Sequence, residues 1–96
     1  MVVAICKLDV LLLDGSASLK DKRQIIRRIK DRVRNKFPVS IAEVGNQELW
    51  QRSELGVAVV SSDTETAQSI LQSVLSYIES EGTVEIVDRT IEIQHH

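Results

Sequence analysis

The stretch "VVAICKLDVLLL" (residues 2–13) sets the class of fold through its alternation. Its even-numbered positions, which run from Val2 to Leu12, are all apolar, and a period of two places them on one face of a β-strand. The odd-numbered positions are mixed, because Lys7 and Asp9 interrupt them. We therefore predict a strand with one fully buried face and one face of mixed character.

A helix is predicted after this strand, beyond a turn at "DGSAS" (residues 14–18). Ser18 fits an N-cap, and Asp21 stands three residues later, as in a capping box. Pro38 ends the helix. Its core-facing stripe is formed by apolar residues at helical spacing, namely Leu19, Ile26, Ile29, Val33 and Phe37.

Two short β-branched strands follow, "VSIAEV" (residues 39–44) and "LGVAVVSS" (residues 55–62). Residues 45–54 between them form either a long hairpin loop or a short extra turn.

A second helix is predicted over about residues 63–81, because Ser62 and Glu65 form another capping box. Gly82 fits the left-handed position that follows a helix. The core stripe of this helix is predicted to be Ala67, Ile70, Leu71, Val74 and Ile78.

The last strand, "TVEIVDRTIEI" (residues 83–93), changes the parity of its apolar positions, which predicts a bulge near Asp88 and Arg89. The element order is then β-α-β-β-α-β. Each helix can serve as a right-handed crossover, so we predict one α+β domain over residues 1–96. Its fold is a ferredoxin-like split βαβ sandwich, with a four-stranded antiparallel sheet and both helices on one face.

Positive charge is concentrated on the first predicted helix. Residues 18–37 hold nine of the twelve Lys and Arg residues together with two Asp residues, a net charge of +7, whereas the whole chain carries −2. A helical projection places Lys22 inside the apolar sector, so its side chain must extend past the apolar residues to bring its ammonium to solvent. Arg28, Arg32 and Lys36 lie on one exposed side. Five further cations form a stripe within about 80° on the other side, and these are Lys20, Arg23, Arg27, Lys30 and Arg34.

This stripe works against the helix that carries it. Exposed cations in the first turn oppose the helix dipole at about 0.3–1 kcal/mol each. Like charges four residues apart, such as Arg23 and Arg27, cost about 0.2–0.5 kcal/mol more. Two interpretations stay open: the stripe contacts the phosphates of a polyanion such as RNA, or it is a solvated face balanced by the acidic remainder of the chain or of a partner subunit.

The mixed face of the first strand predicts an interface. Val3, Ile5 and Leu11, with apolar residues of other strands, would leave a large apolar patch, which usually marks an association site. We expect a homodimer through this face or through an edge strand. Trp50 is assigned to the same set, since it either covers an edge of the core or contacts the partner. RNA recognition by the sheet is not favoured, because no aromatic residue lies on a predicted strand.

Residues for catalysis and for metal or cofactor binding are not apparent. The histidines are confined to His95 and His96, which we interpret as the remnant of a purification tag, and there is no nucleotide-binding glycine pattern or zinc-ligand spacing. The lone Cys6, expected to be an inert core thiol, suits a reducing cytosol. No apolar run approaches the ~20 residues of a membrane span, and the first residues lack a basic leader. We therefore expect a cytoplasmic protein that is not an enzyme.

Several stretches together resemble the YlxP-like family of small bacterial proteins of unknown function. They are "SLKDKR" (18–23), "NKFPVSIAEV" (35–44), the isolated Trp50 and "LGVAVVSSD" (55–63). The resemblance implies a ferredoxin-like fold. The genes of the family often lie among genes for transcription elongation, translation initiation and ribosome maturation, which favours ribosomal RNA as the polyanion. The resemblance assigns no catalytic or binding residues.

The sequence thus predicts a non-enzymatic RNA- or ribosome-associated homodimer. Its predicted phosphate contacts are Lys20, Lys22, Arg23, Arg27, Lys30 and Arg34, with Arg28, Arg32 and Lys36 in supporting positions. The alternative is a dimeric regulatory or scaffolding module that binds an acidic protein through the basic helix or a small anionic ligand at its interface.

Overall fold

A computed structural model describes residues 1–13 and 18–96. The turn expected over residues 14–18 therefore lies outside the described residues except for Ser18. The elements are β1 (Val2–Leu12), α1 (Leu19–Lys36), β2 (Ser40–Gly45), β3 (Arg52–Ser61), α2 (Thr64–Ser80) and β4 (Val84–His95).

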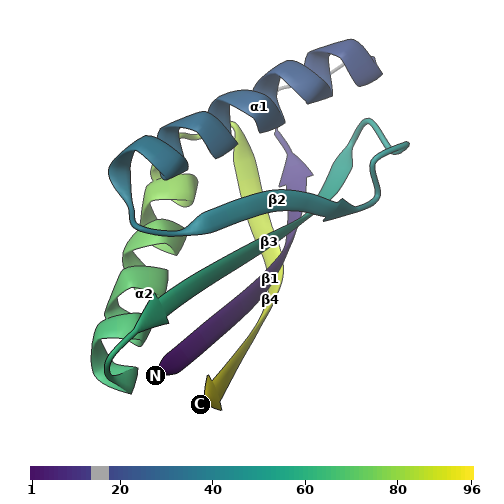
Figure 1. The fold of residues 1–96 in the computed structure, drawn as a ribbon. Coiled ribbons are helices and arrows are strands. Elements are labelled where there is room, and N and C mark those ends of the chain that lie inside the picture. The colour runs from purple at the N-terminus through teal and green to yellow at the C-terminus, as the bar shows by residue number, and fades with distance from the viewer. Residues whose placement is uncertain (14–17) are drawn as a thin grey trace.

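The strands form one sheet in the order β2-β3-β1-β4, and every neighbouring pair is antiparallel. Figure 1 shows α1 running along β2 while α2 lies over the remaining strands, in agreement with the contacts between these elements. The predicted ferredoxin-like architecture is confirmed. Because β2 and β4 are the outer strands, α1 sits above one edge of the sheet.

The core lies between the sheet and the two helices. All even-numbered residues of β1 from Val2 to Leu12 are buried, as predicted, and Leu8 is fully enclosed. The helices supply Ile26, Ile29 and Val33 from α1 and Ala67, Leu71, Val74, Leu75 and Ile78 from α2. Leu75 was absent from the predicted stripe, whereas Ile70, which was included, is only half-buried.

The helix ends follow local side-chain chemistry. The Ser18 hydroxyl accepts a hydrogen bond from the Asp21 amide, as predicted, and Gly82 has φ +74° after α2. The predicted cap of α2 was wrong by one residue. Asp63, not Ser62, is the N-cap, and its carboxylate accepts bonds from both the Thr66 amide at 2.8 Å and the Thr66 hydroxyl at 2.9 Å. The carboxylate offers one oxygen to each donor, and its negative charge strengthens both hydrogen bonds.

The hydrogen bonds from the Thr66 amide and hydroxyl hold the pKa of Asp63 below its ordinary value. A depressed pKa in the folded state means stabilisation that is present above the unfolded pKa and is lost as the pH falls through the folded pKa. We therefore expect Asp63→Ala to lower Tm at neutral pH and to lower it less near pH 2. Asp63→Asn, which also caps helices well, is the control. An equal loss of Tm at both pH values would contradict this assignment.

The parity change in the last strand is a bulge. The register of β4 against β1 shifts so that Asp88 faces Asp9 while Ile86 faces Val10, which leaves Val87 as the extra residue. The predicted bulge is therefore confirmed, one residue before its expected place. Strand β3 begins at Arg52 rather than at residue 55, so residues 46–51 are the hairpin loop between β2 and β3.

Candidate nucleic-acid interface

The basic residues of α1 divide into two flanks, according to what lies beside them. On the flank toward α2, Arg32 pairs with Glu81 at 2.7 Å, and the Lys36 ammonium lies 4.8 Å from the ring centre of Tyr77. The hydrogen bond from Arg32 lowers the pKa of Glu81. Arg32 is therefore balanced within the chain, as the solvated-face interpretation requires.

On the opposite flank, α1 faces β2. Arg34 donates a hydrogen bond of 2.7 Å to the backbone carbonyl of Ile41, and its other terminal nitrogen lies 3.7 Å from Asp31. Lys30 is half-buried on the same flank. Arg34 was predicted to contact phosphate, but its best-formed bond goes to the sheet edge.

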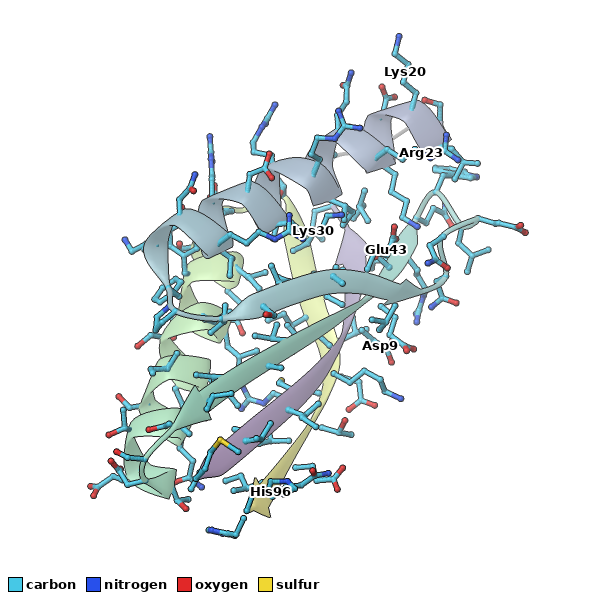
Figure 2. The ribbon with its side chains drawn as sticks, viewed as in Figure 1. Asp9, Lys20, Arg23, Lys30, Glu43 and His96 are labelled. Carbon is cyan, nitrogen blue, oxygen red and sulfur yellow. The ribbon has the colours of Figure 1, made fainter. Side chains whose placement is uncertain are left out.

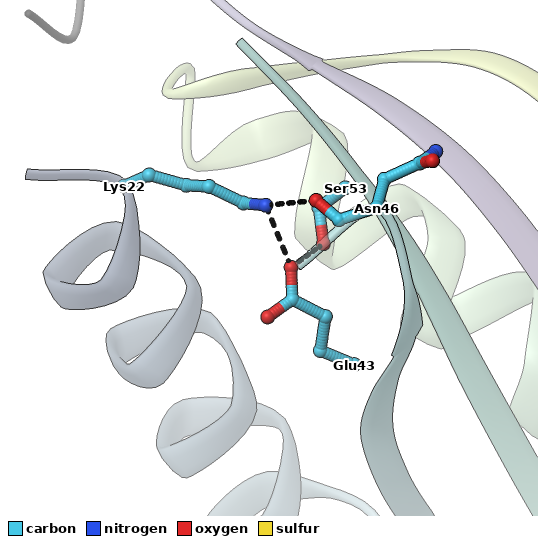
Figure 3. Close-up of polar contacts among 4 residues, drawn as sticks. All are labelled: Lys22, Glu43, Asn46 and Ser53. Atoms are coloured by element: carbon cyan, nitrogen blue, oxygen red, sulfur yellow. Dashed lines mark hydrogen bonds and ion pairs between the residues drawn. The ribbon is translucent and has the colours of Figure 1, made fainter. Parts of the chain in front are cut away.

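Lys22 is the clearest departure from the prediction. Its side chain is fully buried, and its ammonium donates to the Asn46 carbonyl at 2.5 Å and pairs with Glu43 at 2.9 Å. The buried Ser53 hydroxyl donates to the same Glu43 oxygen at 2.6 Å, so the four residues form one satisfied cluster between α1, β2 and β3 (Figure 3). The prediction that Lys22 contacts phosphates is wrong, because an enclosed ammonium cannot reach a ligand in solvent.

Four basic residues remain within the first ten residues of α1. Lys20, Arg23, Arg27 and Arg28 are all exposed, and none forms an ion pair within residues 1–13 and 18–96. Lys20 points away from the sheet, and nitrogen-tipped side chains line the outer surface of the helix (Figure 2). The predicted stripe is thus brought together in space, but its solvent-accessible, unpaired part is the half nearest the start of the helix.

The predicted interface residues fall into two separate groups. Val3 and Ile5 lie at one end of the open sheet face, and Leu11 lies three rows further along β1, toward Trp50 in the hairpin loop. A row of carboxylates separates the groups, because Asp9 is flanked by Glu54 on β3 and Asp88 on β4. Trp50 is 43% exposed, so it does not simply seal the core.

Two apolar residues on this face were not predicted individually. Val44 and Val60 are 51% and 63% exposed; Val60 pairs with Val3, and Val44 packs over Gly56 of β3. The alternation of "VSIAEV" could have placed Val44, since it shares a face with Ala42. Val44, together with Ile5 and small residues of β2 and β3, lines a shallow apolar hollow.

The described part of the chain was also searched for a metal site, a reactive thiol and a membrane span. No group of three or more potential ligand residues that could hold a metal is found in residues 1–13 and 18–96. Cys6 is buried as predicted, and burial raises the pKa of its thiol, which disfavours the reactive thiolate. Neither described helix is both long and apolar enough to cross a membrane.

The chain is similar to several known proteins. The uncharacterised protein YlxP of Bacillus subtilis (strain 168) is 45% identical over 74 residues, which cover 77% of this chain and 80% of that protein. Among solved structures, the structural-genomics protein YJCS has a TM-score of 0.61 at 4% identity, covering 94% of this chain and 96% of that one. A de novo designed protein with a ferredoxin fold has a TM-score of 0.60 at 17% identity, covering 100% of this chain and 88% of that one.

At such low identity these two structures show the fold alone, whereas the sequence relative confirms the resemblance to the YlxP-like family. A family model described as a protein of unknown function, DUF503, matches residues 3–91. The chain therefore belongs to the DUF503 family.

Proposed function

We propose that the protein binds RNA through the exposed cations of α1, as a non-enzymatic, cytoplasmic protein associated with RNA or with ribosomal subunits. The observation that carries the proposal is the cluster of Lys20, Arg23, Arg27 and Arg28, which are exposed and have no carboxylate partner within the described residues. Phosphate groups would supply the negative charges that pair with these cations. Arg suits phosphate because its guanidinium can bind two oxygens at once.

The place of these cations on the helix strengthens the proposal. Lys20 lies in the first turn of α1, where the partial positive charge of the helix dipole disfavours a cation. In contrast, Lys22, Arg32 and Arg34 have partners inside the chain. Internal balance therefore accounts for those three residues. The charge of Arg28 also helps to lower the pKa of Glu81, so Lys20, Arg23 and Arg27 are the cations left without a structural explanation.

The rest of the surface favours the same face. On the open side of the sheet, the row of Glu54, Asp9 and Asp88 would repel phosphate. The chain has one Phe, one Trp and one Tyr, and none of these lies on a strand, so the sheet has no platform for stacking bases. An RNA is thus attracted by α1 and repelled by the opposite face, which would orient the protein.

The test is binding to a single-stranded RNA oligonucleotide and to purified ribosomal subunits across a salt series. Four phosphate contacts on a single strand predict a log–log slope of about −2.8, at about 0.7 for each contact. Arg23→Glu with Arg27→Glu should reduce the slope by about 1.4 and weaken binding at every salt concentration. Both substitutions are at the surface, whereas the neighbouring Lys30 is half-buried.

Arg89→Glu is the matched control for the single variant Arg27→Glu, because Arg89 is an exposed arginine on β4 and the change in charge is identical. We expect only Arg27→Glu to alter the slope. Equal effects of the two variants would mean that RNA affinity depends on the net charge of the protein and not on α1. The absence of binding at low salt would refute the proposal. Binding of an acidic protein with no RNA affinity would support the scaffolding alternative instead.

A further inference from the structure

Exposed apolar side chains gather where the hairpin loop between β2 and β3 meets the end of β1. Leu49 and Trp50 of the loop are 49% and 43% exposed, and Leu13, which follows β1, is 52% exposed. The Leu12 amide donates a hydrogen bond of 2.8 Å to the Gln51 carbonyl, so the end of β1 lies against the loop. A group of large apolar side chains at the surface usually marks a binding site.

A buried contact fixes this loop to the start of α1. The Asn46 carbonyl accepts a hydrogen bond from the Lys22 ammonium at 2.5 Å, which Figure 3 shows, and another from the Leu49 amide at 3.1 Å. Lys22 is fully buried and lies in the first turn of α1. Because both donors share one oxygen atom, Leu49 is held close to the helix. The loop therefore presents Trp50, the next residue, beside the beginning of α1.

The cationic flank of α1 runs toward the same loop. Arg34 bonds to the Ile41 carbonyl near the start of β2, whereas Lys22 bonds to Asn46 just after the end of β2. The first turns of α1 therefore lie at the loop end of β2 (Figure 1). Arg23 precedes Arg34 by about three helical turns, so it lies on the flank that faces β2. The exposed cations at the start of α1 and the exposed loop are thus neighbours.

We propose that Trp50 stacks against an unpaired base of an RNA strand whose neighbouring phosphates are bound by Arg23 and Lys20. This inference rests on the proposed function, and it narrows the ligand to single-stranded RNA, because the bases of a duplex are already stacked on one another. Proteins that bind single strands combine cations along the backbone with aromatic side chains on which bases stack. The start of α1 supplies the cations, and the loop supplies the aromatic ring.

The chemistry of a nucleotide matches both surfaces at once. A purely apolar partner would cover Leu49 and Trp50, but it would leave Lys20 and Arg23 without negative charge, since neither has an ion-pair partner within residues 1–13 and 18–96. A free phosphate would pair with these cations and leave the indole exposed. A nucleotide joins a flat base to a phosphate, so one ligand satisfies the loop and the helix together.

The loop and the helix contribute to affinity in different ways. The only charged residues from 46 to 52 are Glu48 and Arg52, which balance each other, so the loop adds no net charge. Binding by the cations of α1 weakens as salt rises, because phosphate contacts release counterions. Loss of the Trp50 ring should therefore lower RNA affinity at every salt concentration without changing the log–log slope.

The experiment is a titration of the full chain with a short single-stranded RNA oligonucleotide, followed by the emission of Trp50, the only tryptophan. We expect the single strand to quench this emission and the same sequence in a duplex to leave it nearly unchanged. Trp50→Ala should weaken single-strand binding by about 5- to 150-fold, the usual effect of removing one stacked aromatic ring. Trp50→Phe keeps a ring for stacking and should retain most of the affinity.

Leu49→Ala is the matched control, because Leu49 is an equally exposed neighbour that has no aromatic ring. It should bind RNA as the wild-type protein does, and an equal loss in Leu49→Ala and Trp50→Ala would overturn the assignment of stacking. A Trp50 emission that changes with protein concentration in the absence of RNA would also overturn it, because Trp50 would then contact a second copy of the chain.

The failure of this inference can be told apart from the failure of the proposed function. Single-strand binding with the expected salt slope, but with unchanged Trp50 emission and unchanged affinity in Trp50→Ala, would overturn the stacking contact and leave phosphate binding by α1 in place. The absence of RNA binding at low salt would overturn both. Equal quenching by the duplex would overturn the restriction to single strands.

Discussion

Lys22→Met is expected to lower the free energy of unfolding by about 3 kcal/mol, near the lower end for the loss of one partner from a buried ion pair. Methionine has about the length of lysine and matches its apolar stem, so the substitution leaves little cavity. The cost arises at Glu43, whose side chain is 15% exposed and would keep only the Ser53 hydroxyl as a hydrogen-bond partner within the described residues. Urea unfolding at neutral pH measures the difference.

Lys20→Met is the control for this prediction, because Lys20 is exposed two residues earlier on the same helix. It should change stability by a few tenths of a kcal/mol at most, as surface substitutions usually do. The double variant Lys22→Met with Glu43→Gln completes a thermodynamic cycle. We expect a coupling of about 1–3 kcal/mol between the two sites, and strictly additive effects would contradict a direct interaction.

The Lys22 cluster also fixes the hairpin loop. The Asn46 carbonyl accepts hydrogen bonds from the Lys22 ammonium and from the Leu49 amide, and Asn46 has φ 58°. Such a backbone conformation persists where surrounding contacts hold it. In Lys22→Met the amides of residues 46–51 should therefore exchange with solvent faster, and the emission of Trp50, the only tryptophan of the chain, should report the change.

Leu8→Ala is expected to have the second large effect, a loss of about 2–5 kcal/mol in the free energy of unfolding. Leu8 is fully buried at the centre of β1, with Leu55 beside it on β3 and Arg89 on β4. The surrounding strands are held by hydrogen bonds and cannot collapse into the cavity. A domain of this size would then lose more than about 10 °C in Tm, which differential scanning calorimetry measures.

Leu13→Ala provides the comparison for Leu8→Ala, because Leu13 loses the same atoms from a side chain that is 52% exposed. It should leave Tm nearly unchanged. If Leu8→Ala were equally mild, the packing of β1 between the sheet neighbours and α2 would have to be different from the one described.

The fold was predictable because its signals are local. Alternation in β1, the cap at Ser18, the glycine at position 82 and the parity change in β4 each depend on residues a few positions apart. The exception at Ser62 is instructive. Ser62 and Asp63 are both good caps, and only the geometry of the Thr66 donors decides between them.

The candidate site was only partly predictable, because the state of each cation depends on distant groups. The helical projection located Lys22 in the apolar sector, but its partners Glu43 and Asn46 come from another element. Arg32 meets Glu81 across 49 positions of sequence. A count of charges on a helix therefore overestimates the number available to a ligand, and the structure reduces the cluster to its N-terminal half.

The hydrogen bond between Arg34 and the Ile41 carbonyl has a consequence for how the chain avoids polymerising. A strand at the edge of a sheet offers unpaired backbone groups to any other extended chain. At the β2 edge, Arg34 already occupies one of these acceptors and sets a positive charge beside it. At the β4 edge, the bulge at Val87 interrupts the regular backbone pattern. Both edges thus disfavour the addition of further strands. Arg34, which the sequence suggested only as a charge for a ligand, therefore also protects the sheet against aggregation.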